Sequence, residues 1–174
     1  AVESWDISAA KDGSVMAWMY NSTENSSLYD VYIAGEGGVG ANPNSGFIFY
    51  LFSSLEKVDA RHLHTDNATT FVSMFKNCYK LRKVDLRGWN TENVTSLEEM
   101  FRNCNVLDTL DLSSFDTSKV TTMRFMFYLC KKLKHIYAGE GWTTESIANL
   151  YDGVFNCCYA IIGKTDDDTT NQAI

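Results

Sequence analysis

The most informative part of the sequence runs from Leu107 to Lys132 and reads L-D-T-L-D-L-S-S-F-D-T-S-K-V-T-T-M-R-F-M-F-Y-L-C-K-K. Its pattern recurs every 26 residues, so that a leading leucine stands at Leu55, Leu81, Leu107 and Leu133. A segment of this size cannot bury its own apolar side chains, and it must stack on its neighbours to do so. The sequence therefore predicts a protein built from stacked repeats.

Each repeat has two halves with different apolar periods. The first half reads L-x-x-L-x-L, and the alternation at its end predicts a half-buried strand. In the second half the apolar spacing is i, i+3, i+4, i+7, which is typical of one face of a short helix. This spacing is carried by Phe71, Met74, Phe75 and Cys78, by Leu97, Met100, Phe101 and Cys104, and by Met123, Met126, Phe127 and Cys130. The sequence predicts a strand-turn-helix unit.

The register of the repeat predicts a single domain. Its units are residues 29–54, 55–80, 81–106, 107–132 and 133–163, and the last of them gains two residues. Atypical terminal units are the usual way in which such a stack closes its ends. Residues 1–28 are predicted to form an N-terminal cap, and residues 164–174 are predicted to form a solvated acidic tail.

The run L-D-L-S-S-F-D-T-S-K-V-T-T-M-R-F-M-F-Y-L-C-K-K-L, residues 110–133, resembles the BspA-type leucine-rich repeat of bacterial surface proteins. The resemblance extends over residues 29–163, and W-D-I-S and D-G-S-V-M-A-W-M, between Trp5 and Met19, are similar to the segment that precedes such repeats. It implies an α/β fold: a right-handed solenoid of leucine-rich-repeat type with about five 26-residue units and an N-terminal cap. Because family members are secreted or cell-surface proteins linked to adhesion, it also implies an extracellular or cell-surface location and a role in binding host matrix.

Composition limits the partners. The chain has 174 residues and a net charge of −7, which argues against nucleic acid and anionic membrane surfaces, since both are bound through basic patches. No apolar run is long enough to cross a bilayer. The sequence begins at Ala1 without a signal-like start, so we expect a processed protein or a trimmed piece, either a monomer or part of a longer chain.

The cysteines are predicted to be structural. Cys78, Cys104, Cys130 and Cys158 fall at an inward position of the repeat, where a free thiol behaves as a small apolar side chain. A disulfide between the first two stays open as an alternative, although parallel Cβ vectors would strain it. Ligands in one line cannot enclose a tetrahedral zinc ion. Cys157 is the odd thiol and is expected to be exposed.

No catalytic constellation is apparent. His62 and His64 share a face on a strand-like segment but lack an obvious third metal ligand. The cysteines lack a neighbouring base, and an acidic pair such as Asp85 and Asp111 is expected in a repeat without catalysis. The sequence therefore predicts a protein that is not an enzyme and that holds no metal or cofactor.

The candidate binding face consists of the outward positions of the predicted strands. Two interpretations stay open for it: a solvated ion-pair lattice that sets strand register, or a surface that recognises an extracellular protein or glycan, as in adhesion. The alternative function is a structural spacer that presents other domains and binds nothing itself. The face comprises Lys57, Asp59, Arg61, Lys83, Asp85, Arg87, Thr109, Asp111, Ser113, His135 and Tyr137.

Overall fold

The computed structural model describes residues 3–6, 15–23, 29–148 and 153–161. The chain divides into two compact units: unit 1 holds Ala1–Gly40 and His62–His64, and unit 2 holds Ala41–Arg61 and Thr65–Ile174. Parts of the predicted N-terminal cap and the whole predicted acidic tail, residues 164–174, lie outside the described residues. Among the residues described, no helix is long and apolar enough to span a membrane.

Unit 1 is built on an antiparallel sheet. Strands β1 (Glu3–Asp6), β2 (Val15–Asn21) and β3 (Tyr29–Gly35) pair in this order. Tyr20 and Tyr32 meet edge to face, with ring centroids 5.6 Å apart, and Ala17 is buried. The two-residue strands β4 (Val39–Gly40) and β6 (Leu63–His64) pair in parallel. The segment from Tyr29, assigned to the first repeat from the sequence, therefore forms antiparallel sheet here.

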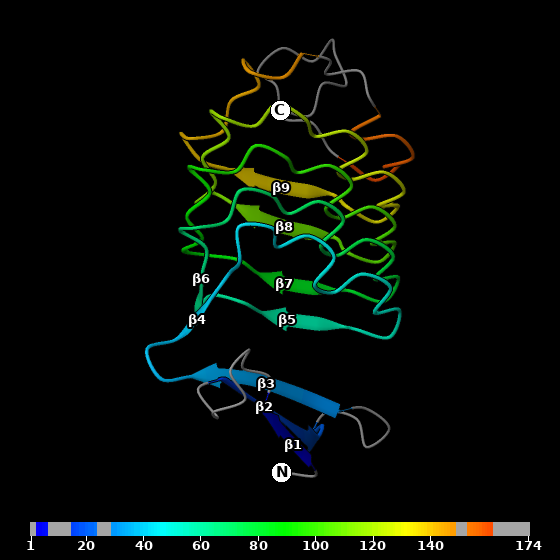
Figure 1. Ribbon diagram of the computed structural model, residues 1–174. Helices are drawn as coiled ribbons and strands as arrows, with labels where there is room; N and C mark the ends of the chain where they lie inside the picture. The colour runs from blue at the N-terminus through cyan, green and yellow to red at the C-terminus, as the bar shows by residue number, and fades with distance from the viewer. Residues whose placement is uncertain (1–2, 7–14, 24–28, 149–152, 162–174) are drawn as a thin grey trace. The chain divides into compact units, whose positions relative to one another are not determined.

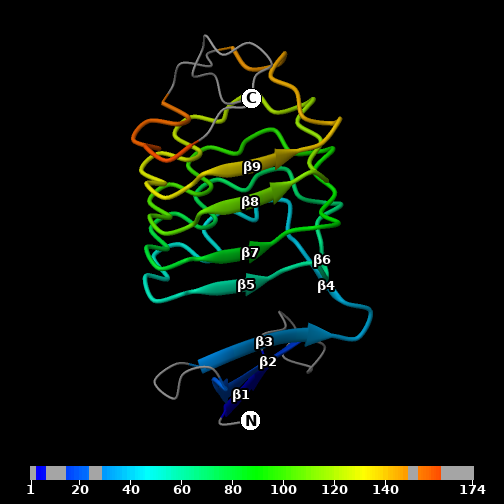
Figure 2. The same cartoon turned by 180° about the vertical axis from the view of Figure 1, so that it is seen from behind.

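Unit 2 carries short parallel strands on one side. They are β5 (Lys57–Asp59), β7 (Lys83–Asp85), β8 (Thr109–Leu112) and β9 (His135–Ala138), and they lie one above another in both views (Figures 1 and 2). Strand β5 pairs with β7, and β8 pairs with β9. Every pair joins residues that are 26 apart, such as Lys57 with Lys83 and Thr109 with His135. Paired strands of unit 2 are thus one 26-residue period apart along the sequence.

In the second half of each 26-residue segment, the backbone N–H groups donate alternately to the neighbouring segment and to a carbonyl of the same segment. One N–H donates to the next segment, as from Ser73 to the Glu98 carbonyl oxygen at 2.9 Å. The following N–H closes a local turn, as from Met74 to the Phe71 carbonyl oxygen at 3.2 Å. The same alternation recurs along residues 71–78 and 97–104. A helix would instead keep all of these bonds within one segment.

Left-handed backbone explains why no helix forms in these segments. Two residues of each segment, four apart, have positive φ angles near 60°, and a right-handed helix needs negative φ at every residue. Within the segments predicted as helical, these residues are Ser73 (56°), Asn77 (66°), Glu99 (56°), Asn103 (64°), Phe125 (55°) and Leu129 (63°). The apolar side chains at i, i+3, i+4 and i+7 still reach the interior, but they do so from paired turns.

The predicted α/β fold is therefore wrong. A right-handed solenoid of leucine-rich-repeat type with strand-turn-helix units requires a helix in each unit. Over residues 29–148 and the other described ranges the structure has short strands, turns and irregular backbone, with no helix. The sequence pattern was correct in marking which side chains point inward and wrong in the local conformation that places them there.

A column of stacked phenylalanine rings runs through the core of unit 2. Its members are Phe49, Phe75, Phe101, Phe127 and Phe155, with successive ring centroids 5.1, 5.3, 5.9 and 5.3 Å apart and interplanar angles of 12° or less. Phe75, Phe101 and Phe127 are fully buried. Offset-stacked rings add stabilisation beyond their buried area, so this column is a main source of cohesion between segments.

The left-handed positions yield a prediction. Asn77 and Asn103 occupy the second such position of their segments, and the side-chain amide of Asn103 donates to Asn77 Oδ1 at 2.5 Å. Leu129 stands at the equivalent position with φ 63°. Since asparagine tolerates this region better than leucine, we expect Leu129→Asn to raise the free energy of unfolding by roughly 0.5–1 kcal/mol. Urea denaturation measures it, with Leu129→Ala as a control that is expected to destabilise. An asparagine variant as unstable as the alanine variant would contradict the argument.

Candidate functional site: the strand face of unit 2

The predicted face residues lie together on the outside of the strands of unit 2, and we call this surface the strand face. Eight of its residues lie on β5, β7, β8 and β9, and Arg61, Arg87 and Ser113 follow the ends of β5, β7 and β8. Asp85 and Asp111 are half-buried, whereas the other face residues are exposed. The alternating residues Val58, Val84 and Leu110 turn inward. The period-two pattern therefore placed these side chains correctly, although it says nothing of what they bind.

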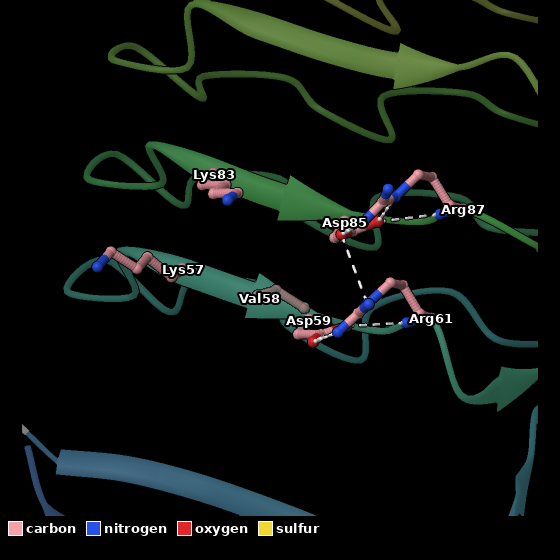
Figure 3. Close-up of a pocket in the computed structure, with 7 residues that line it drawn as sticks. All are labelled: Lys57, Val58, Asp59, Arg61, Lys83, Asp85 and Arg87. Atoms are coloured by element: carbon pink, nitrogen blue, oxygen red, sulfur yellow. Dashed lines mark hydrogen bonds and ion pairs between the residues drawn. The ribbon is translucent and has the colours of Figure 1, made fainter.

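The first two rows of the strand face form an ion-pair lattice. Asp59 accepts two hydrogen bonds from Arg61, at 2.9 Å from Nε and 2.6 Å from Nη2. Asp85 is held in the same way by Arg87, at 2.9 and 2.7 Å. Arg61 also lies 3.5 Å from Asp85, which ties the two rows together (Figure 3). Bidentate pairs of this kind fix the position of the guanidinium group as well as its charge.

These contacts shift the pKa values of three side chains in the lattice. The hydrogen bond from the Arg87 side chain lowers the pKa of Asp85, and Arg61 adds to the effect. Pairing with Asp59 raises the pKa of Arg61, and pairing with Asp85 raises the pKa of Arg87. Asp85 is therefore ionised and the two guanidinium groups are cationic at neutral pH, so none of these three groups is poised to transfer a proton.

The two rows line a depression of about 310 Å³ that is partly open to solvent (Figure 3). The side chains around it are Lys57, Val58, Asp59, Arg61, Lys83, Asp85 and Arg87. The lysines lie at one end and the Asp–Arg pairs at the other. Four cationic side chains and two carboxylates line it, on a chain whose net charge is −7. This part of the surface is therefore suited to an anion.

The next two rows differ in character. Asp111 accepts a hydrogen bond from the Ser113 backbone at 3.0 Å, and it has no arginine of its own at the position that Arg61 and Arg87 fill. Beyond it, His135 pairs in register with Thr109, and Tyr137 pairs with Asp111. Tyr137 is 57% exposed. These rows offer hydroxyl groups, an imidazole and one aromatic ring.

The cysteine column has no accessible thiolate. Cys78, Cys104, Cys130 and Cys158 are buried and free, and each thiol donates to a backbone carbonyl of the preceding segment, for example Cys104 to Phe75 at 3.3 Å. Burial raises the pKa of all four thiols, to about 11 for Cys78 and Cys158. Protonated buried thiols are poor nucleophiles and poor metal ligands. Within the described ranges, no three His, Cys, Asp or Glu side chains gather to hold a metal ion.

A second charged cluster, which the apolar pattern of the sequence does not predict, lies elsewhere on unit 2. It belongs to the second half of the segments, where the paired turns lie, and we call this part the turn half. Glu99 accepts hydrogen bonds from Lys76 Nζ at 2.5 Å, from Ser73 Oγ at 3.2 Å, and from Arg102. The Arg102 guanidinium lies over the Tyr128 ring, 5.0 Å from its centroid. The sequence does carry a signal for this cluster, since aromatic and cationic residues recur there at the 26-residue period. They are Tyr50, Lys76, Arg102 and Tyr128.

Glu99 gives a pH prediction. Burial by itself would raise the pKa of Glu99, but its hydrogen bonds to Lys76 and Arg102 outweigh burial and lower it from 4.5. A carboxyl whose pKa is lower in the folded than in the unfolded state stabilises the fold above the unfolded pKa, and this stabilisation is lost as the pH falls through the folded pKa. We therefore expect the free energy of unfolding to drop as the pH falls below 4.5.

Glu99→Gln removes this contribution. The variant is expected to lose about 1–2 kcal/mol at neutral pH, because Lys76 and Arg102 lose their anionic partner, and to show a shallower decline in acid. Urea unfolding at a series of pH values measures both effects. The exposed Glu92 serves as the control, since Glu92→Gln makes the same chemical change on the surface and should leave the free energy of unfolding at neutral pH unchanged. An unchanged slope in Glu99→Gln would show that Glu99 does not contribute to the pH dependence of the free energy of unfolding.

Comparison with known proteins assigns the family. Searches of curated proteins and of solved structures gave no significant match. Residues 47–165 match the family model described as Mycoplasma protein of unknown function, DUF285. The resemblance to BspA-type leucine-rich repeats is therefore wrong, because the matching family is a different one and the described residues lack the helix of such a repeat. The match spans more than half of the sequence, and the chain therefore belongs to the family of Mycoplasma proteins of unknown function, DUF285.

Proposed function

We propose that the chain is a non-catalytic binding domain, secreted or displayed on the bacterial surface, whose strand face contacts an extracellular partner in adhesion. The observation that carries this proposal is the depression between β5 and β7, where Lys57, Lys83, Arg61 and Arg87 surround two carboxylates. Surfaces with fixed charges and a local excess of one sign select partners of opposite charge.

Two further features support a binding role over an enzymatic one. The depression is partly open to solvent, whereas active sites are usually enclosed enough to exclude water. Its carboxylates are held by arginines, and the free thiols of the column are buried with raised pKa values. Rigid side chains on paired strands are better suited to recognition than to proton or group transfer.

The strand face is tested by a variant that removes both members of each ion pair: Asp59→Asn, Arg61→Gln, Asp85→Asn and Arg87→Gln together. Removing whole pairs leaves no carboxylate without its partner. Glu98→Gln with Arg124→Gln is the matched control, because that pair, 3.5 Å apart, lies on the turn half. Both proteins are probed by biolayer interferometry against purified extracellular matrix proteins and immobilised glycans, after circular dichroism has verified folding.

The proposal predicts that the wild-type chain and the control bind a member of the panel and that the strand-face variant loses at least tenfold in affinity. If the strand-face variant binds as the wild type does, the strand face is not the contact surface. A chain that binds no member of the panel would favour the alternative function, a structural spacer.

A further inference from the structure

We infer that the strand face takes an anionic oligosaccharide, laid across the strands so that its acidic groups meet the lysine end of rows one and two and a sugar ring lies on Tyr137. This inference rests on the proposed function and specifies the ligand for the same surface. Strands β5, β7, β8 and β9 follow one another along unit 2 (Figure 1). A ligand that crosses them meets each row in turn.

The distribution of charge along the rows gives the ligand its direction. The lysines and arginines of the strand face all belong to the rows of β5 and β7, while the row of β8 carries Asp111 and the row of β9 has no lysine or arginine on the strand face. An acidic group would be attracted to the first two rows and repelled by the third. The acidic end of the ligand therefore lies over β5 and β7.

Lys83 is the side chain most available to that acidic group. The guanidinium forks of Arg61 and Arg87 are occupied by Asp59 and Asp85, whereas no hydrogen bond or ion pair engages the Lys83 ammonium group within the described part of the chain. It is exposed and directly opposite Lys57 in the parallel register. An ammonium group is a compact charge with three donors, which suits a sulfate or carboxylate oxygen of any orientation.

The remaining rows favour a sugar over a peptide. Peptides most often bind a sheet by adding a strand to its edge, but the strand face presents side chains. Interfaces with folded proteins depend on buried apolar anchors, and among the residues of the strand face only Tyr137 is a large exposed hydrophobic side chain. Thr109, Ser113 and His135 supply polar groups, and the flat Tyr137 ring offers an apolar surface to the C–H face of a sugar.

The test uses the full chain and three probes in isothermal titration calorimetry: a heparin-derived hexasaccharide, the same oligosaccharide after desulfation and carboxyl reduction, and a polyglutamate peptide. The inference predicts binding of the first probe and none of the second. Lys83→Gln should weaken binding of the hexasaccharide roughly tenfold, as expected for one charge-assisted hydrogen bond, and Lys83→Arg should restore most of it.

Two further variants separate the strand face from general charge. Tyr137→Ala should weaken binding at least several-fold, while Tyr137→Phe, which keeps the ring, should bind as the wild type does. Lys119→Gln removes the same charge as Lys83→Gln from the loop that follows β8, where Lys119 donates to Asn93 Oδ1 at 3.0 Å, and should have no effect. Hexasaccharide binding that is unaffected by the Lys83 and Tyr137 variants would overturn the inference.

The probes also separate this inference from the proposed function. Binding of polyglutamate through Lys83, with no binding of the hexasaccharide, would overturn the oligosaccharide and leave the strand face as a binding surface. If neither anion binds and the matrix panel also gives nothing, the inference and the proposed function fall together.

Discussion

Replacing Thr91 with valine is expected to lower the free energy of unfolding by roughly 2–4 kcal/mol, because two backbone groups lose their partner at once. Thr91 is 2% exposed. Its hydroxyl donates to the Asp116 carbonyl oxygen and accepts from the Asp116 N–H, both at 2.8 Å. Thr65 and Thr117 make the same double contact with the following segment. The hydroxyl thus joins one segment to the next in the interior.

Thr91→Ser is the matched control. It keeps the hydroxyl and loses one methyl group, which costs about 1 kcal/mol. Urea denaturation monitored by tryptophan fluorescence compares the two variants with the wild type. If valine is tolerated as well as serine, the hydroxyl does not hold the segments together, and side-chain packing alone would have to explain their cohesion.

Truncating the middle of the phenylalanine column should have a still larger effect. Phe101 is fully buried, and its ring lies 5.3 Å from that of Phe75 and 5.9 Å from that of Phe127. Phe101→Ala is expected to cost about 3–5 kcal/mol, since it leaves a cavity in a close-packed core and removes two ring contacts. Thermal and urea unfolding both measure this loss.

Two further variants serve as controls for Phe101→Ala. Phe101→Leu keeps most of the buried volume and should cost clearly less than the alanine variant. Tyr79→Ala removes a ring that is 41% exposed and should change stability by less than about 1 kcal/mol. A loss for Phe101→Ala no greater than that for Tyr79→Ala would contradict the stacked column as a source of stability.

Register and burial could be predicted from the sequence, because both follow directly from the 26-residue period. Residues 26 apart pair across neighbouring strands, such as Asp59 with Asp85, and the cysteines at this spacing are buried. Alternation along each strand then places the lysines and aspartates outside. These relations need only the spacing of similar residues and no knowledge of backbone angles.

The backbone of the second half could not be predicted in this way. Apolar residues at i, i+3, i+4 and i+7 face one side both in a helix and in a pair of successive turns, so their spacing does not distinguish the two. The residues with left-handed backbone, which exclude a helix here, differ in type. Asn77 and Asn103 are typical of such a position, but Phe125 and Leu129 are not. Neighbouring segments override local preference by supplying backbone hydrogen bonds.

The sequence offers an ion-pair lattice as one interpretation of the strand face, and the structure has such a lattice in the rows of β5 and β7, but spacing does not give its individual contacts. The contact of Arg61 with Asp85, at 3.5 Å, joins two segments and depends on side-chain conformations that spacing does not give. The Glu99 cluster does not follow from apolar spacing, because Lys76, Glu99 and Arg102 lie between the apolar positions of their segments. Both cases show that the charged contacts depend on how segments stack, which the period alone leaves open.

Mapping the contact surface by nuclear magnetic resonance shows whether the strand face is the binding surface. The ¹⁵N-labelled chain is titrated with the heparin-derived hexasaccharide and its backbone amide shifts are followed. If the strand face binds this ligand, the largest changes fall on β5, β7, β8 and β9, with Lys83 and Tyr137 among them. Changes confined to the turn half around Glu99 or to unit 1, or no changes at all, would contradict this binding.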